Sequence, residues 1–214
     1  MWPNPEPTEQ LLADARAGTA DAVNRLLDRH REAVHRLVQM RLDAKIQGRI
    51  DVSDVVQDVL VEANRRLQDY LANPQLSFHL WIRQITQDRI IDAHRRHRVS
   101  AKRSVDREQA SMAPAGDDHS TYELIGQIQD RELTPAAAVA QKEMAKRVEA
   151  AITQLNAQDA EMIVMRHYEH LTNQETAQAL KLSEPAASMR YLRALRRLRE
   201  LLGEGPGNAD TSSS

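Results

Sequence analysis

Residues 172–199 read TNQETAQALKLSEPAASMRYLRALRRLR, and this stretch decides how the C-terminal part of the chain folds. Thr172 and Glu175 have the spacing of a capping box, in which each side chain accepts a hydrogen bond from a backbone N–H at the helix start. The pattern predicts a short helix from here to Leu180, a tight turn, and a second helix with Ser183 as its N-cap. Two short helices joined by such a turn form the helix-turn-helix pattern of DNA-binding proteins.

The second helix of this pair is amphipathic and strongly basic. Its predicted inward side consists of Ala187, Tyr191, Ala194, Leu195 and Leu198. The opposite side, which would enter the major groove, consists of Ser188, Met189, Leu192, Arg193 and Arg196. Six cations and one anion lie between Lys181 and Arg199. A solvated basic helix in an ordinary bundle is the alternative, but the caps, the turn length and the charge together favour DNA binding.

Further towards the N-terminus, residues 51–70 form a second clear amphipathic pattern with one apolar stripe. The other side carries carboxylates at four-residue spacing, at Asp54, Asp58 and Glu62. This helix is predicted to break at Asn73-Pro74, because proline cannot continue the hydrogen-bond ladder. The acidic side is open to three interpretations: a solvated face, a metal or acid/base site, or a docking surface for a basic partner.

A third helix is predicted from Ser77, an N-cap candidate, to about Arg98. Its buried side consists of Phe78, Trp81, Ile82, Ile85, Ile90 and Ile91. Eight cations and three anions lie between Arg83 and Arg107. Cations near a helix C-terminus complement the helix dipole, but this number exceeds that need and favours contact with phosphates.

Four more helices are predicted from the remaining periodic segments. Residues 8–17 form a short helix, and residues 19–42 form a longer one with Thr19 as its N-cap. A Thr-Pro pair starts a helix over residues 134–154. Asn156 caps the next helix, whose inward side consists of Ile163, Val164 and Tyr168.

Residues 99–133 lack helical periodicity and are predicted to be a linker between two domains. The domains are residues 1–98 and 134–202, and the tail at residues 203–214 is predicted to be disordered. The linker is acidic, because six anions and one cation lie between Glu108 and Leu133. The net charge of −2 for all 214 residues, which alone argues against nucleic acid, therefore averages over segregated clusters.

The composition excludes several kinds of site. The chain has no cysteine, which excludes disulfide frameworks, thiolate metal sites and cysteine nucleophiles. No Gly-rich phosphate loop or other catalytic signature occurs, so no catalytic residue and no cofactor is predicted. The pairs His94 with His97 and His167 with His170 have no third ligand in register, so no metal site is predicted.

Nothing in the sequence predicts contact with a membrane. No apolar run approaches the roughly 20 residues that cross a bilayer. The first residues, MWPNP, have neither the basic nor the apolar region of a signal peptide. A cytoplasmic location is therefore expected.

Three stretches carry a resemblance to a known family. The first is residues 51–59, which read DVSDVVQDV. The second is residues 78–85, which read FHLWIRQI and are followed by Ile91-Asp92 and Arg95-Arg96. The third is residues 175–198, which read ETAQALKLSEPAASMRYLRALRRL. They are similar to D-x-x-D-L-V-Q-E-V-F, to F-x-x-W-L-x-x-I with L-D-x-x-R-R, and to E-I-A-x-x-L-x-x-S-x-x-T-V-x-x-R-L-x-R-A. In this order they resemble bacterial RNA polymerase sigma factors of the sigma-70 family, and more narrowly its small extracytoplasmic-function group.

This resemblance implies an all-α fold of two small domains, a sigma region 2-like bundle and a sigma region 4-like helix-turn-helix domain, joined by a flexible linker. It implies that the helix at residues 51–70 binds the clamp helices of the polymerase β′ subunit. The corresponding polymerase-binding candidates are Asp51, Asp54, Gln57, Asp58 and Glu62. It also implies that the loop at residues 71–77 receives a flipped base of the promoter −10 element. The −10 candidates are Asn73, Gln75, Gln84, Gln87, Asp88, Arg95, Arg96 and Arg98.

The C-terminal helix resembles the family's reader of the −35 element. The −35 candidates are Ser188, Met189, Arg190, Leu192, Arg193, Arg196 and Arg197. Arg193 is the strongest hydrogen-bond donor for base edges among them. Two departures from the family pattern stand out. Lys181 replaces the usual glycine of the turn, so it is expected to adopt a left-handed conformation at some cost, and residues 185–187, PAA, replace G-T-V.

The sequence therefore predicts a non-enzymatic specificity subunit that binds core RNA polymerase, at the β′ clamp helices and the β flap, and directs initiation at promoter DNA. An anti-sigma factor is a further candidate partner. The alternative is a stand-alone helix-turn-helix regulator, which leaves residues 51–98 unexplained. A third hypothesis is a helical enzyme that uses the three carboxylates of residues 54–62. The acidic linker is open to two roles, lying in a basic channel of the polymerase or screening the basic faces of the free protein.

Overall fold

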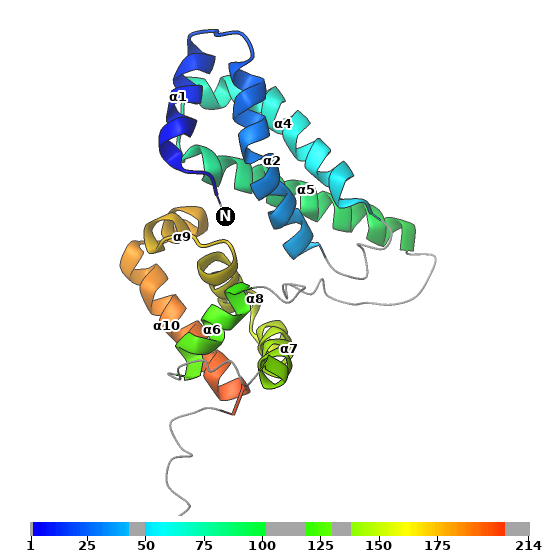
Figure 1. The fold of residues 1–214 in the computed structure, drawn as a ribbon, viewed down its shortest axis with the longest axis vertical. Helices are drawn as coiled ribbons and strands as arrows, with labels where there is room; N and C mark the ends of the chain where they lie inside the picture. The colour runs from blue at the N-terminus through cyan, green and yellow to red at the C-terminus, as the bar shows by residue number, and fades with distance from the viewer. Residues whose placement is uncertain (1, 43–49, 102–118, 130–137, 204–214) are drawn as a thin grey trace, which may run out of the picture. The chain divides into compact units, whose positions relative to one another are not determined.

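All the secondary structure of the described residues is helical (Figure 1), as predicted. The structure is a computed structural model, and it describes residues 2–42, 50–101, 119–129 and 138–203. The chain divides into two units, residues 1–110 and 111–214. No helix in these described ranges is long and apolar enough to cross a membrane.

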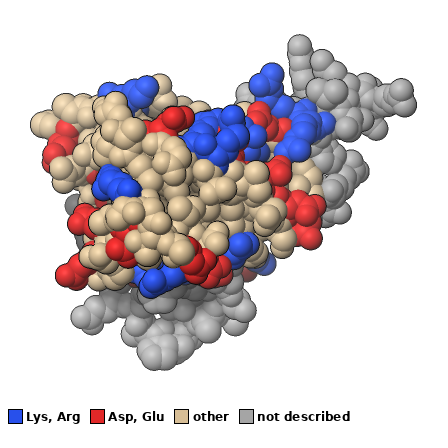
Figure 2. Space-filling view, turned by 90° about the horizontal axis from the view of Figure 1, so that it is seen from above, with Lys and Arg blue, Asp and Glu red and all other residues tan. Residues whose placement is uncertain are grey.

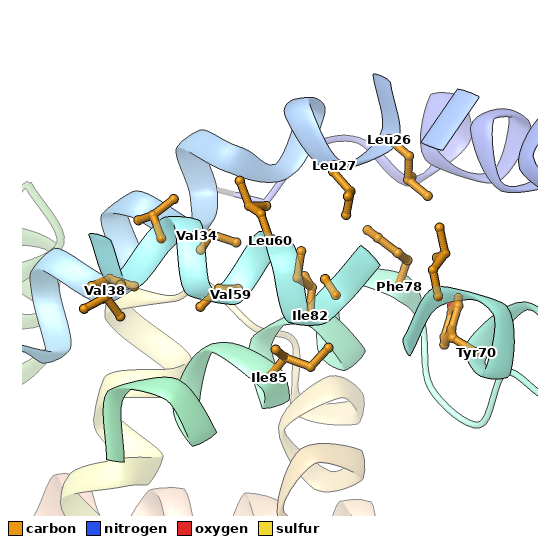
Figure 3. Packing of buried hydrophobic residues seen from close by; sticks show 14 of the residues in the cluster. Leu26, Leu27, Val34, Val38, Val59, Leu60, Tyr70, Phe78, Ile82 and Ile85 are labelled. Carbon is orange, nitrogen blue, oxygen red and sulfur yellow. The ribbon is translucent and has the colours of Figure 1, made fainter. Parts of the chain in front are cut away.

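The N-terminal unit is a bundle in which one central helix packs on three others. Its elements are α1 (Pro5–Arg16), α2 (Ala22–Arg41), α4 (Val52–Ala72) and α5 (Phe78–Ala101). Helix α2 packs on α1, α4 and α5, and α4 also packs on α5. Figure 3 shows how side chains at helical spacing point into one interior, with Val34, Val59 and Ile82 fully buried. The spacing that predicted these helices is thus the spacing that buries their apolar sides.

An aromatic cluster closes the end of this bundle where α4 meets α5. The Phe78 ring lies edge-on to the rings of His30, at 4.7 Å between centroids, and of Tyr70, at 5.6 Å. Trp81 packs against both Tyr70 and Phe78. The Tyr70 hydroxyl donates a hydrogen bond to the carbonyl of Leu76, at 3.0 Å. These contacts hold the α4–α5 loop against the core, which positions the predicted −10 loop.

Two details of the N-terminal unit differ from the sequence prediction. Thr19 is not the N-cap of α2, because residues 19–21 form a turn in which the Thr19 carbonyl accepts from the N–H of Ala22, and Asp21 is the cap residue at φ 64°. Ile91 is not buried but 56% exposed. One residue is a rotation of about 100° on a helix, so Ile91 turns to solvent while Ile90 stays in the core.

The C-terminal unit contains a helix that the sequence prediction missed. Its described elements are α6 (His119–Gln129), α7 (Ala138–Gln154), α8 (Ala157–Ile163), the π-helical turn η2 (Val164–Tyr168), α9 (Asn173–Leu180) and α10 (Glu184–Leu201). Helix α6 lies within the segment predicted to be a linker, yet it packs on α7 and η2. Leu124, Ile125 and Ile128 are buried there. The expectation that residues 99–133 lack regular structure is therefore wrong for residues 119–129, and α5 also continues to Ala101.

Several predicted helix boundaries are confirmed. Asp51 caps α4 by accepting from the N–H of Ser53 at 2.8 Å, and α4 ends before Asn73. Asn156 caps α8 through the N–H of Asp159. Helix α1 starts one turn earlier than predicted, because the side chain of Asn4 caps it. The Thr-Pro start predicted at residue 134 and the tail beyond residue 203 lie outside the described residues.

Candidate nucleic-acid interface

The helix-turn-helix forms as its sequence predicts. Thr172 and Glu175 make both hydrogen bonds of the capping box, and Ser183 caps α10 through the N–H of Ala186. Lys181 ends α9 at φ 54°, in the left-handed conformation that its place in the turn predicts. The side chain of Asn173 donates to the carbonyl of Glu184 at 3.1 Å, which ties the start of α9 to the start of α10.

Helix α10 buries one side and presents the other to solvent. Ala187, Ala194 and Leu198 are fully buried on the inward side. The exposed −35 candidates are Met189, Leu192, Arg193, Arg196 and Arg197, whereas Ser188 and Arg190 are half-buried. Arg197 forms an ion pair with Glu200 at 2.8 Å on the same helix. The seven predicted residues are therefore all at least partly accessible.

Tyr191 anchors this helix to the rest of the C-terminal unit. Its hydroxyl donates to Oε1 of Gln127 on α6 at 3.0 Å and lies 2.9 Å from Nε2 of His167. Because the hydroxyl has one proton and gives it to Gln127, Nε2 of His167 must carry a proton and donate to the hydroxyl oxygen. Arg166 lies over the Tyr191 ring at 5.4 Å.

This anchor changes the role of two residues singled out from the sequence. Burial lowers the pKa of His167 to about 4, so the ring is neutral and engaged with Tyr191. Arg199 donates to the backbone carbonyl of Gln127 at 2.9 Å, so one of the six cations near the helix-turn-helix serves to hold α6. In the described parts of the chain, no three residues of the types that bind metals form a cluster.

The −10 candidates lie on the α4–α5 loop and along one exposed side of α5. Asn73 and Gln75 are exposed, and Nε2 of Gln75 donates to Oδ1 of Asn73 at 2.6 Å. Gln84, Asp88 and Arg95 recur at helical spacing and are exposed. Gln87 is half-buried and accepts from Arg83, at 3.0 Å. The side chain of Arg98 lies outside the described residues.

Fewer cations of the basic segment that begins at Arg83 are accessible on α5 than its sequence suggests. Arg83 is only 3% exposed, so it packs inside the unit and is not available to phosphates. Arg95 and Arg96 remain exposed. Figure 2 shows basic side chains in the upper part of one face with acidic side chains directly beside them.

The acidic side of α4 is less acidic than its sequence suggests. Glu62 is 9% exposed, and its carboxylate accepts hydrogen bonds from Arg65, at 2.6 and 2.9 Å, and from Arg66. These hydrogen bonds lower the pKa of Glu62 to about 2, and the bond from Arg65 has the largest effect. Asp51 is used as the helix cap, and Asp54, Gln57 and Asp58 are exposed. The exposed part of the predicted docking surface is thus centred on Asp54 and Asp58.

Two features of this surface were missed from the sequence. Arg96, a −10 candidate, forms an ion pair with Asp58, a polymerase-binding candidate, at 3.3 Å. Val61 is 58% exposed beside the acidic residues. The exposure of Val61 could have been predicted, because this residue lies outside the apolar stripe of α4. The ion pair joins residues 38 apart and leaves no local signal.

The comparisons with known proteins agree with this geometry. A family model described as Sigma-70 region 2 matches residues 26–99, which cover all of α4 and most of α2 and α5. A family model described as Sigma-70, region 4 matches residues 151–200, which include the helix-turn-helix. The fold and these two regions define a sigma factor, a non-enzymatic protein that binds core RNA polymerase and promoter DNA.

The curated relatives place the chain within this class. It is 30% identical over 200 residues to the RNA polymerase sigma factor CnrH of Cupriavidus metallidurans, covering 93% of this chain and 96% of the relative. It is 24% identical over 193 residues to the ECF RNA polymerase sigma factor BldN of Streptomyces coelicolor, covering 90% of this chain and 65% of the relative. The chain belongs to the extracytoplasmic-function sigma factors of the sigma-70 family and directs transcription initiation, as predicted.

Two solved structures share the fold. One is CnrH in complex with the cytosolic domain of CnrY, with a TM-score of 0.53, 23% identity, and coverage of 90% of this chain and 95% of that chain. The other is the sigma factor RpoE in complex with the anti-sigma factor NepR from Bartonella quintana, with a TM-score of 0.52, 17% identity, and coverage of 86% and 98%. The stand-alone regulator is set aside, because the region 2 match accounts for the part that it left unexplained.

Proposed function

We propose that this sigma factor reads promoters at two elements and binds polymerase through α4, next to the surface of α5 proposed for DNA. Helix α10 would read the −35 element with the seven candidates named above. The observation that carries this proposal is the exposure of Arg193 and Arg196 on the outward side of a fully capped helix-turn-helix. Cations on that side would neutralise phosphates and fix the position of the helix in the groove.

The −10 element would be read by the α4–α5 loop and α5. Asn73 and Gln75 are exposed amides on a loop that Tyr70 holds in place. Such groups suit the edge of a flipped base, whose unstacking costs a few kcal/mol and needs a rigid receiving site. Gln84, Asp88 and Arg95 would continue the contact along α5, with Arg95 and Arg96 meeting phosphates.

Core polymerase would be bound by the exposed side of α4, with the β′ clamp helices as the contact and Asp54, Gln57 and Asp58 at its centre. The C-terminal unit would contact the β flap. An anti-sigma factor is the proposed regulatory partner, supported by the complex of the structural relative RpoE with NepR. These partners would place the chain in the cytoplasm.

Reconstituted transcription tests the function as a whole. Core RNA polymerase, with and without the full-length chain, is incubated with a library of genomic fragments, and the transcript 5′ ends are mapped. We expect new start sites that depend on the chain and share two upstream elements. If no fragment supports chain-dependent initiation, the proposal is wrong. Tight binding to duplex DNA without polymerase would instead favour a stand-alone regulator.

We expect Arg193→Ala to weaken binding of the reconstituted holoenzyme to its −35 duplex by about 1–3 kcal/mol, because a strong donor to a base edge is lost. The measurement is a titration of duplexes from the mapped promoters. Lys146→Ala removes an exposed cation of the same unit outside α10 and is the matched control. Unchanged affinity in the Arg193 variant would remove this residue from the interface.

We expect Asp58→Lys to weaken binding of the chain to core polymerase about tenfold, because it places a like charge against a basic partner. Stability should change little, since the Asp58–Arg96 pair is exposed and such pairs contribute at most about 1 kcal/mol. Asp28→Lys breaks an exposed ion pair of the same 3.3 Å length on α2 and is the matched control. Equal polymerase affinities for the two variants would return the α4 face to an ordinary solvated surface.

A further inference from the structure

The outward side of α10 is divided along its length into an apolar half and a basic half. The first half, which follows the Ser183 cap, exposes Glu184 at its first residue and then the apolar Pro185, Ala186, Met189 and Leu192. Met189 is 61% exposed and Leu192 is 53% exposed. The second half exposes arginines, at positions 193, 196 and 197. A solvated helix would not need large apolar side chains at its exposed start.

These two apolar residues do not support the fold of the unit. The inward side of α10 is complete without them, because Ala187, Ala194 and Leu198 are fully buried against the rest of the unit. Met189 and Leu192 lie three residues apart, so they point to the same side and are separated by about 4.5 Å along the helix. They therefore form one small apolar surface beside a basic one.

The position of this surface on a helix-turn-helix identifies what it would meet. In this motif the N-terminal residues of the second helix contact base edges, while flanking cations contact the phosphates. The C5-methyl group of thymine is the apolar group in the base-pair pattern of the major groove. The polar side chains of this half of α10 are Glu184, exposed at its first residue, and Ser188 and Arg190, both half-buried, so Met189 and Leu192 are its most exposed large side chains beyond the first turn.

Resting on the proposed contact with the −35 element, we propose that Met189 and Leu192 read thymine through its methyl group. The cationic half of the same side carries the exposed Arg196, which fits the phosphates that flank such bases. This charge complementarity is why duplex DNA, and not another protein, covers the apolar surface. The separation of about 4.5 Å is close to one base-pair step of about 3.4 Å, so the two residues read thymines on the same or neighbouring steps.

Uracil tests this proposal, because it pairs as thymine does and lacks only the methyl group. A promoter mapped with the reconstituted holoenzyme is synthesised with each −35 thymine replaced singly by uracil, and binding of the holoenzyme is measured. For the natural chain, we expect one or two positions at which uracil weakens binding about fourfold, the effect of one buried methyl. Uracil between the two elements should have no effect.

The variants assign that effect to residues. Met189→Ala and Leu192→Ala should each abolish the thymine preference at one position. Arg193→Ala is the matched control: it should weaken binding to thymine and uracil duplexes equally and so keep the preference. Thermal unfolding should be unchanged in the first two variants, because both side chains are exposed.

Four outcomes would overturn the proposal. Specific initiation without any effect of uracil in the −35 element would refute it and leave the proposed function intact. A uracil effect that survives in both alanine variants would assign the methyl contact to other residues. Weaker binding to core polymerase without DNA in these variants would show that a protein covers the surface. Absence of any specific initiation would remove the proposed function together with this inference.

Discussion

Replacing Phe78 by alanine should destabilise the N-terminal unit by about 3–5 kcal/mol, the usual cost of truncating a buried aromatic residue. Phe78 is the only phenylalanine of the chain and is 3% exposed. Its ring contacts His30 from α2, Tyr70 from α4 and Trp81 from its own helix. No neighbouring ring can fill the cavity without giving up one of its own contacts.

Tryptophan fluorescence can follow this effect selectively. Both tryptophans of the chain, Trp2 and Trp81, lie in the N-terminal unit, whereas circular dichroism reports on the helices of both units. In urea, the fluorescence midpoint of the Phe78 variant should fall steeply, while the helix signal of the C-terminal unit should keep its midpoint. Ile91→Ala, at an exposed position of the same helix, should shift stability by less than about 0.5 kcal/mol. Equal effects of the two substitutions would contradict the packing described here.

The same variant should separate the two halves of promoter binding. Phe78 begins α5 directly after the loop that carries Asn73 and Gln75. Loss of the ring should therefore loosen the proposed −10 contact, whereas α10 belongs to the other unit and should keep its affinity for a −35 duplex. Binding of the two elements on separate DNA fragments would measure this.

The second large effect is a loss of stability of the N-terminal unit at low pH, caused by His30. His30 is 1% exposed, and its Nδ1–H donates to the carbonyl of Leu26 at 2.9 Å. Burial lowers the pKa of His30 to about 4, despite that hydrogen bond, and the charges of Arg29 and His79 act in the same direction. The folded state therefore holds the neutral ring, and protonation would place a charge in the aromatic cluster.

The direction of the pH dependence follows from proton binding. Between pH 6.5 and about 4, unfolded chains bind a proton on His30 that folded chains do not, so stability falls as the pH falls through this range. Below about pH 4 both states bind the proton and the contribution levels off. A shift of this size corresponds to about 3 kcal/mol for the N-terminal unit.

His30→Leu should remove this loss of stability at low pH. The free energy of unfolding, measured by tryptophan fluorescence in urea at pH 7 and at pH 4.5, should differ much less in the variant than in the natural chain. His35→Leu, at a half-buried position of the same helix, is the matched control and should keep the acid sensitivity. An unaltered pH dependence in the His30 variant would show that another group causes it.

The sequence was sufficient for the elements whose apolar residues recur over several turns. The helices around residues 51–72 and 78–101, the capping box at Thr172 and the turn at Lys181 all follow from local spacing and local hydrogen bonds. Helix α6 was missed because it is short and its few apolar residues do not form a long stripe. Such a helix is stabilised by packing on its neighbours, which no local pattern contains.

The candidate site shows the same limit. The outward residues of α10 were predictable because exposure alternates with the helical period. Three other features of the site could not be predicted, because each depends on side-chain conformation or on packing against another helix. They are the burial of Arg83, the binding of two arginines to Glu62, and the Asp58–Arg96 pair. Formal charge counted along the chain therefore overstated both the basic and the acidic surfaces.

Helix α6 also shortens the covalent connection between the two units. Since Gln127 is bonded to Tyr191 and Arg199 of α10, α6 moves with the C-terminal unit. The covalent connection between α5 and α6 is then residues 102–118, half of the linker expected from sequence. A chain of that length spans at most about 60 Å when fully extended. With the promoter contacts proposed above, a connection of this length would bound the spacing between the −35 and −10 elements that the two units can contact together.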